Sequence, residues 1–219
     1  MRAPWAVVCD FDGTATVDDV GDLVSIRFAG RNHWQRAEDD YKTGAFSFGE
    51  LLKRIFAPIT ATPEEIAAFA RGAAVLRPGF ERFVGACREA AVPFVICSAG
   101  LDLYIGPVLE RLAPELRAHV QVRCNEGRCS PAGLEVAFHG NGAHGGCGSC
   151  GFCKRTVVEE LRARGHRVAF LGDGSGDRCG AKAADEVFAR RRLAEWCAAE
   201  GLRHERFETF DDVAARFPR

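Results

Sequence analysis

The segment WAVVCDFDGT, residues 5–14, joins a short apolar run to two aspartates and a glycine. Residues 5–9 have the length and the β-branched content of a buried strand. Asp10 and Asp12 follow this run directly, and Gly13 marks a turn, so we expect both carboxylates to leave the carboxyl end of a sheet. Ligands of open α/β folds bind at that edge, which makes the segment the first candidate site in the chain.

The rest of the chain alternates short apolar runs with stretches of helical periodicity, which is typical of a parallel sheet covered by helices. Further strands are predicted at residues 94–97, 168–171 and 186–188, and helices at residues 103–112, 156–164 and 191–200. The predicted fold class is therefore α/β, with a Rossmann-like parallel sheet as its core.

The interval between the first two strands is too long for one crossover helix, because a whole βαβ unit needs only about 30 residues. Two patterns inside it, which begin at Ser47 and Thr62, place a glutamate three residues later and fit helix-capping boxes. We therefore predict a small helical cap domain at residues 16–76, inserted into a core domain that comprises residues 1–15 and 77–219.

A second irregular stretch, residues 119–153, precedes Lys154. Its strand-like runs at residues 119–123 and 134–138 flank turn-forming residues and predict a β-hairpin. The remainder is a glycine- and cysteine-rich loop that leads into the lysine.

The composition of the 219 residues bounds the partners of the chain. Lys and Arg number 29 and Asp and Glu 30, so the net charge of −1 provides no overall basic field for nucleic acid or for an anionic membrane. The apolar runs are shorter than the ~20 residues of a membrane helix. Ten cysteines without a recognisable signal peptide predict a cytoplasmic protein with reduced thiols. No feature of the sequence defines an oligomeric state.

Three other polar groups stand at predicted strand or helix ends. Asp173 and Asp177 lie in GDGSGD, residues 172–177, directly after a strand; Ser98-Ala99-Gly100 follows another; Lys154 opens a helix. Carboxylate oxygens in such a place suit Mg²⁺. Each group alone also fits an ordinary turn, a helix cap or a solvated side chain. Asp18, Asp19 and Asp22, which complete an acidic run after the first strand, fit a turn and helix caps better than a metal site.

Taken together, DFDGT at 10–14, Ser98, Lys154 and GDGSGD at 172–177 resemble the haloacid dehalogenase-like (HAD) superfamily, and DFDGT resembles its phosphatases. The resemblance implies Asp10 as the nucleophile, which forms an aspartyl-phosphate, and Asp12 as the acid and base.

The resemblance also implies which residues bind the metal and the phosphate. Mg²⁺ would be held by Asp10, by the carbonyl of Asp12 and by Asp173. Asp177 would be a further metal ligand or would support one of these ligands. The phosphate-binding residues would be Thr14, Ser98, Ala99, Gly100 and Lys154. Thr14 anchors either the loop or the phosphate in this interpretation, and Ala99 stands where glycine is more usual.

The insertion and residues 181–188 resemble the phosphoserine-phosphatase-like branch, and HGGCGSCGFCK at 144–154 is similar to the phosphatases of methionine salvage. The resemblance implies a Mg²⁺-dependent phosphomonoesterase that acts on a small phosphorylated metabolite, namely the methylthio-ketopentenyl phosphate of that route. Phosphoserine or another small metabolite is the alternative substrate. A non-catalytic zinc-binding or interaction module is the alternative of another class.

Nine of the ten cysteines fall into two groups, and Cys179 is assigned to neither. A structural Zn²⁺ site, free thiols and a disulfide are the alternatives for the group near Lys154, which comprises Cys124, Cys129, Cys147, Cys150 and Cys153. Core packing is expected for Cys9, Cys87, Cys97 and Cys197. Arg27, Arg31, His33 and Trp34 of the insertion are candidate substrate contacts, although ordinary helix surface and packing explain them better.

Overall fold

The computed structural model describes residues 3–139 and 150–217. Within these residues a seven-stranded sheet has the order β4-β3-β2-β1-β5-β6-β7, and its neighbouring strands are parallel except for the antiparallel pair β3 and β4. The strands are β1 (Trp5–Cys9), β2 (Phe94–Leu101), β3 (Val120–Ser130), β4 (Gly133–Ala137), β5 (Arg167–Gly172), β6 (Glu186–Ala189) and β7 (Glu205–Arg206). The α/β fold predicted from the alternation of apolar runs is confirmed.

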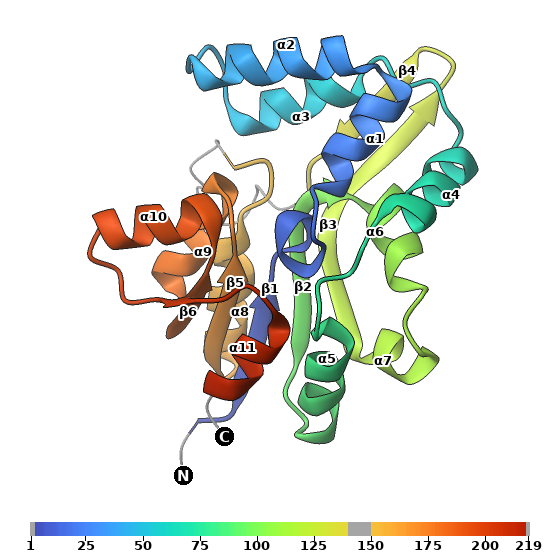
Figure 1. The fold of residues 1–219 in the computed structure, drawn as a ribbon. Helices are drawn as coiled ribbons and strands as arrows, with labels where there is room; N and C mark the ends of the chain where they lie inside the picture. The colour runs from blue at the N-terminus through green and yellow to red at the C-terminus, as the bar shows by residue number, and fades with distance from the viewer. Residues whose placement is uncertain (1–2, 140–149, 218–219) are drawn as a thin grey trace.

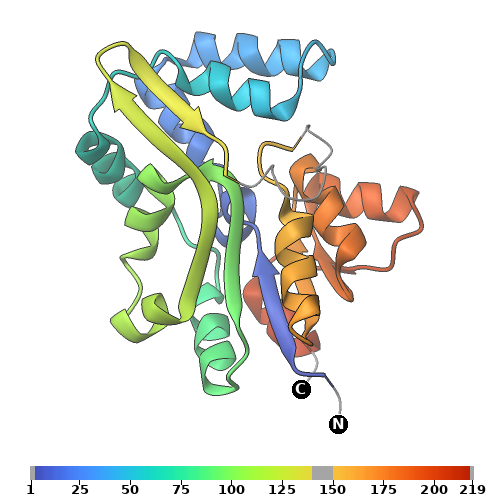
Figure 2. The ribbon, with the colours of Figure 1, turned by 180° about the vertical axis from the view of Figure 1, so that it is seen from behind.

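Helices cover both faces of this sheet. Figure 1 shows α5 and α11 in front of the strands, and Figure 2 shows α8 on the opposite face. The helices outside the insertion are α5 (Phe80–Glu89), α6 (Asp102–Leu109), α7 (Pro114–His119), α8 (Lys154–Ala163), α9 (Arg178–Ala183), α10 (Arg191–Ala199) and α11 (Phe210–Arg216). The four cysteines expected in the core are buried, as predicted, at Cys9, Cys87, Cys97 and Cys197.

The predicted insertion is helical. It contains α1 (Val20–Phe28), α2 (Arg31–Lys42), α3 (Phe48–Phe56) and α4 (Pro63–Ala73). Of these, α1–α3 gather beyond the carboxyl end of the sheet, beside the β3–β4 hairpin (Figure 1). The division into a core domain and a cap domain stays a prediction.

One of the two predicted capping boxes is complete. Thr62 accepts from the amide of Glu65 while the Glu65 carboxylate accepts from the amide of Thr62. Ser47 accepts from the amide of Glu50, but the Glu50 carboxylate is bonded to Arg54 instead. The second box is therefore only half formed.

Strand β2 extends beyond its predicted end at residue 97. Ser98, Ala99 and Gly100 were expected just beyond the strand, but they lie within it, and this buried strand pairs with β3 as far as Leu101 after a shift of register. The small, polar residues gave no strand signal, because pairing and burial rather than propensity keep them extended.

The predicted hairpin is confirmed, but its first arm is longer. β3 pairs in parallel with β2 through residues 120–125 and then in antiparallel with β4 through residues 126–130. It is therefore both a strand of the main sheet and one arm of the hairpin. No helix in the described part of the chain is long and apolar enough to cross a membrane.

Candidate active site

A cavity of about 460 Å³ lies between the carboxyl ends of the core strands and the helices of the insertion. Asp10 and Asp173 reach it directly after β1 and β5, Ser98 reaches it from within β2, and helix α8 begins at it with Lys154. Because these strands are parallel, their carboxyl ends meet at one edge of the sheet, and residues far apart in the chain become neighbours.

Three of the cavity carboxylates form a cluster. Oxygens of Asp10, Asp173 and Asp177 all lie within 4.8 Å of one another. Burial and then the charge of Asp177 raise the pKa of Asp10 well above its usual value, and the same causes raise the pKa of Asp173. Such crowding of negative charge out of water needs a cation, and three hard oxygen donors fit Mg²⁺.

Lys154 supplies part of that positive charge. Its ammonium contacts Oδ1 of Asp10 and lies 2.6 Å from Oδ1 of Asp177, with all three side chains buried. Burial opposes the charge on Lys154, but Asp10 and Asp177 outweigh this effect and raise its pKa. The lysine therefore stays cationic beside the carboxylate of Asp10, for which the family resemblance implies the role of nucleophile.

Asp12 points away from the acidic cluster. Its Oδ1 accepts from the amides of Val20 and Gly21 at 2.9 and 3.3 Å, and its Oδ2 lies 3.1 Å from the hydroxyl of Tyr104. Burial, followed by the charge of Asp19, raises the pKa of Asp12 to about 8. A carboxyl group with this pKa holds its proton at neutral pH and can donate it, as a general acid must.

The loop after β1, η1 (Phe11–Ala15), is fitted closely against Asp173. Gly13 has a φ of 71°, and a Cβ there would lie 2.6 Å from Oδ2 of Asp173. The buried Thr14 hydroxyl donates to Oδ1 of Asp173 at 3.0 Å, so it ties the loop to β5. Glycine at position 13 is required both by the backbone conformation and by this close approach.

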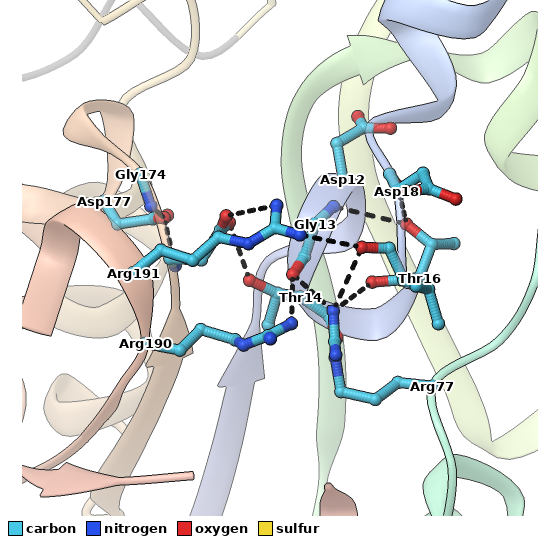
Figure 3. Close-up of polar contacts among 12 residues, drawn as sticks. Asp12, Gly13, Thr14, Thr16, Asp18, Arg77, Gly174, Asp177, Arg190 and Arg191 are labelled. Carbon is cyan, nitrogen blue, oxygen red and sulfur yellow. Dashed lines mark hydrogen bonds and ion pairs between the residues drawn. The ribbon is translucent and has the colours of Figure 1, made fainter. Parts of the chain in front are cut away.

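Two arginines that the sequence analysis missed hold the same loop (Figure 3). Arg77 donates at 2.7 Å to the carbonyls of Gly13, Thr14 and Thr16, and Arg190 donates to the Gly13 carbonyl at 3.0 Å. Both arginines are buried. Burial and the neighbouring arginines lower the pKa of Arg77 to about 10, which still leaves it charged at neutral pH.

The segment around Ser98 is held in place by hydrogen bonds. Ser98 accepts from the amide of Gly100 at 2.9 Å, so that amide is used within the strand. Asn125 of β3 donates to the carbonyls of Ala99 and Gly151, which ties β2 to the segment before Lys154. No motif pointed to Asn125, because its role depends on contacts between distant segments.

The acidic residues after η1 have mixed roles. Asp19 caps α1 by accepting from the amide of Asp22, which agrees with the helix-cap interpretation, and both residues also line the cavity. Asp22 accepts from the indole of Trp34 at 2.7 Å, and burial raises the pKa of Asp22 to about 6.

Of the four candidate contacts in the insertion, only Trp34 is among the described residues that line the cavity. Arg27 lies over the ring of Phe28, and His33 is bonded to the carbonyl of Arg54. Ordinary helix packing therefore accounts for these two residues.

The predicted zinc ligands are only partly described. Cys147 lies outside the described residues. Cys124 and Cys129 are half-buried on β3, and Cys150 and Cys153 are buried just before α8. Among the described residues the only group with metal-binding spacing is the carboxylate cluster, and none of these cysteines belongs to it. Structural zinc stays a prediction.

The fold and this arrangement of carboxylates, serine and lysine define a phosphatase of the α/β class. Residues 7–182 match the family model of haloacid dehalogenase-like hydrolases, and the chain belongs to that family. The alternative of a non-catalytic module is not retained.

The chain resembles curated proteins over nearly its whole length. It is 30% identical over 219 residues to 2-hydroxy-3-keto-5-methylthiopentenyl-1-phosphate phosphatase from Bacillus pumilus, covering 99% of this chain and 92% of that protein. It is 32% identical to the protein of the same name from Geobacillus thermodenitrificans, covering 100% and 98%. It is 34% identical to the bifunctional enzyme MtnB/MtnX of Bacillus licheniformis over 97% of this chain, which spans only 49% of that longer protein.

Solved structures share the fold at low sequence identity. A substrate-bound phosphoserine phosphatase superimposes with a TM-score of 0.75 at 13% identity, covering 100% of both chains. A phospho-aspartyl intermediate analogue of phosphoserine phosphatase gives 0.74 at 14% identity, covering 99% of this chain and 100% of that one. At these identities the likeness establishes the architecture.

Proposed function

We propose that the chain is a Mg²⁺-dependent phosphomonoesterase that hydrolyses 2-hydroxy-3-keto-5-methylthiopentenyl-1-phosphate through an aspartyl-phosphate on Asp10. Two observations support the proposal. Relatives of that name match nearly the whole chain, and the site unites a buried carboxylate, a second carboxyl group with a raised pKa and a buried lysine.

The first half of the reaction transfers the phosphoryl group to the protein. The carboxylate of Asp10 attacks phosphorus, the bond to the leaving oxygen breaks, and Asp12 gives its proton to that oxygen. The Lys154 ammonium, which contacts Asp10, places positive charge against the transferred group. Bound by Asp10, Asp173 and Asp177, Mg²⁺ would supply the remaining positive charge against the phosphoryl oxygens.

The second half of the reaction regenerates the carboxylate of Asp10. A water molecule attacks phosphorus, and its proton passes to Asp12, while the bond between phosphorus and Asp10 breaks. Asp12 is then protonated again and ready for the next substrate. Its raised pKa of about 8 suits both halves, because the group must give and regain a proton near neutral pH.

The apolar wall of the cavity favours one substrate over the other. Helix α3 presents Phe48, Leu51, Leu52, Ile55 and Phe56 to the cavity. A methylthioalkyl tail would gain about 25 cal/mol for each Å² of apolar surface that it buries there. The ammonium and carboxylate of phosphoserine would instead lose water against the same wall.

Phosphoserine is retained as a second candidate because charged side chains also line the cavity. Glu38, Lys42, Arg191 and Arg192 could pair with an ammonium and a carboxylate. The balance between the charged residues and the apolar wall therefore decides between the two substrates.

A comparison of kcat/KM for the two phosphate esters tests the proposal. We expect a preference of about 100-fold or more for the thioether ester, because several apolar groups, each contributing roughly 1–3 kcal/mol, differ between them. Chelation of the metal with EDTA should stop both reactions, and Mg²⁺ should restore them. A preference for phosphoserine, or turnover that EDTA leaves unchanged, would contradict the proposal.

A further inference from the structure

Tyr104 of α6 reaches from the core helix to Asp12. The ring is buried, and the hydroxyl donates to Oδ2 of Asp12 at 3.1 Å. Two glycines leave the space that the hydroxyl occupies. A Cβ at Gly21 would lie 2.8 Å from the phenol oxygen, and a Cβ at Gly100 would overlap with it and lie 2.8 Å from Oδ2 of Asp12.

The hydrogen bonds of Asp12 identify the oxygen that carries the proton. Oδ1 already accepts from two backbone amides, those of Val20 and Gly21, so it acts as an acceptor only. Oδ2 instead faces the hydroxyl groups of Ser98 and Tyr104, which can accept as well as donate, so Oδ2 is the oxygen placed to carry the transferable proton. The chemistry of Asp12 depends on how Oδ2 is held.

Two hydroxyl groups in the described part of the chain donate to Oδ2. Ser98 does so at 3.4 Å, and its oxygen also accepts from the amide of Gly100. Tyr104 does so at 3.1 Å and reaches Asp12 from a rigid, buried ring. The phenol is therefore the stronger constraint on the rotation of the carboxyl group.

We propose that Tyr104 is a positioning residue, which holds Oδ2 of Asp12 toward the leaving oxygen of the substrate. This inference rests on the proposed function, because it assigns Tyr104 a role only through the acid and base chemistry of Asp12. The phenol donates to one lone pair of Oδ2; the other carries the proton and, once the proton has left, accepts from Ser98. Tyr104 keeps its own proton throughout, and Asp12 alone exchanges protons with the leaving oxygen and with water.

The test compares two esters that differ in their need for an acid. Phenyl phosphate has a poor leaving group that must be protonated as it departs, whereas para-nitrophenyl phosphate releases a stable anion. We expect Tyr104→Phe to lower kcat/KM about tenfold for phenyl phosphate, as loss of one hydrogen bond to a carboxylate predicts, and about twofold or less for the nitro compound. Tyr41→Phe, which removes the other tyrosine hydroxyl of the chain, should change both values by the same factor.

A second variant disturbs the same contact from the other side. In Gly100→Ala the added methyl group collides with the phenol oxygen and with Oδ2 of Asp12, so kcat/KM should show the same dependence on the leaving group. An equal loss with both esters in Tyr104→Phe would overturn the positioning role.

The Asp12→Asn background separates this inference from the proposed function. Asp12→Asn alone should lower kcat/KM for phenyl phosphate far more than for the nitro compound, and adding Tyr104→Phe should then have no further effect. If Asp12→Asn shows no dependence on the leaving group, the acid of the proposed function is wrong, and the role of Tyr104 falls with it. If only Asp12→Asn shows the dependence, or if Tyr104→Phe retains its effect on that background, the role of Tyr104 alone is refuted.

Discussion

Replacement of Arg77 by methionine is expected to loosen the loop that carries Asp10 and Asp12. The Arg77 guanidinium donates to three carbonyls of this loop at 2.7 Å, and to the carbonyls of Val17 and Glu208 at 3.3 Å. Methionine fills a similar volume but donates nothing. The carbonyl oxygens that the loop turns inward then lose their partner in a place where water does not replace it.

The magnitude follows from the bonds that have no substitute. The Gly13 carbonyl keeps its bond to Arg190, whereas the carbonyls of Thr14 and Thr16 lose their short bonds. An unsatisfied buried carbonyl costs about 1–3 kcal/mol, so two of them lower the free energy of unfolding by roughly 4 kcal/mol. For a chain of this size, that corresponds to a fall in Tm of about 8–16 °C.

Thermal unfolding measures the loss of stability. Turnover of para-nitrophenyl phosphate measures the effect of the loosened loop on kcat. Arg82→Met is the matched control, because Arg82 is exposed, its only polar side-chain partner among the described residues is Asp211, and a surface ion pair contributes about 1 kcal/mol or less. Arg77→Lys, which keeps the charge without the planar set of donors, should fall between the two. If Arg77→Met unfolds at the same temperature as Arg82→Met and retains full kcat, the loop does not depend on Arg77.

Three further outcomes follow from the site. The pKa of Asp12 in the folded chain, about 8, exceeds its unfolded value, so the native state keeps a proton that the unfolded state releases. The Tm of the metal-free protein should therefore fall as pH rises from about 5 to about 8. Mg²⁺ should raise the Tm more at the higher pH. A metal-free Tm that rises over this range would contradict the assignment. Leu52→Ala should raise KM for the thioether ester by about tenfold and leave KM for phosphoserine within about twofold, because it removes roughly 1–2 kcal/mol of apolar contact from the wall; equal changes would contradict a tail bound there. Elemental analysis of gently purified protein should find one zinc per chain if the cysteines near Lys154 hold a structural metal, and a zinc content near zero would discard that hypothesis.

The sequence predicted which residues meet at the candidate site because most of them follow short apolar runs. Asp10, Ser98 and Asp173 each stand after an apolar run, and parallel strands bring such positions together without any further information. Lys154 was placed correctly at the start of a helix. The family motif then gave each residue a role that local patterns alone left open.

The supporting residues could not be predicted in the same way. Arg77, Arg190, Tyr104 and Asn125 act through contacts that span between 26 and 177 positions in the sequence, and no local pattern marks such partners. The end of β2 was missed for a related reason, since Ser98-Ala99-Gly100 stays extended through its pairing and burial. A single sequence therefore indicates the candidate reactive residues more readily than it indicates the residues that hold them in place.

The central claim is that a phosphoryl group passes through Asp10, and the Asp12→Asn variant tests it most directly. With para-nitrophenyl phosphate this variant can transfer the phosphoryl group without an acid but lacks the base that activates water, so the phosphoenzyme should accumulate. We expect a burst of about one nitrophenolate per chain, and mass spectrometry of the acid-quenched protein should locate the phosphate on Asp10. A phosphate on another residue, or release of nitrophenolate without a burst and without phosphate on the protein, would contradict the account.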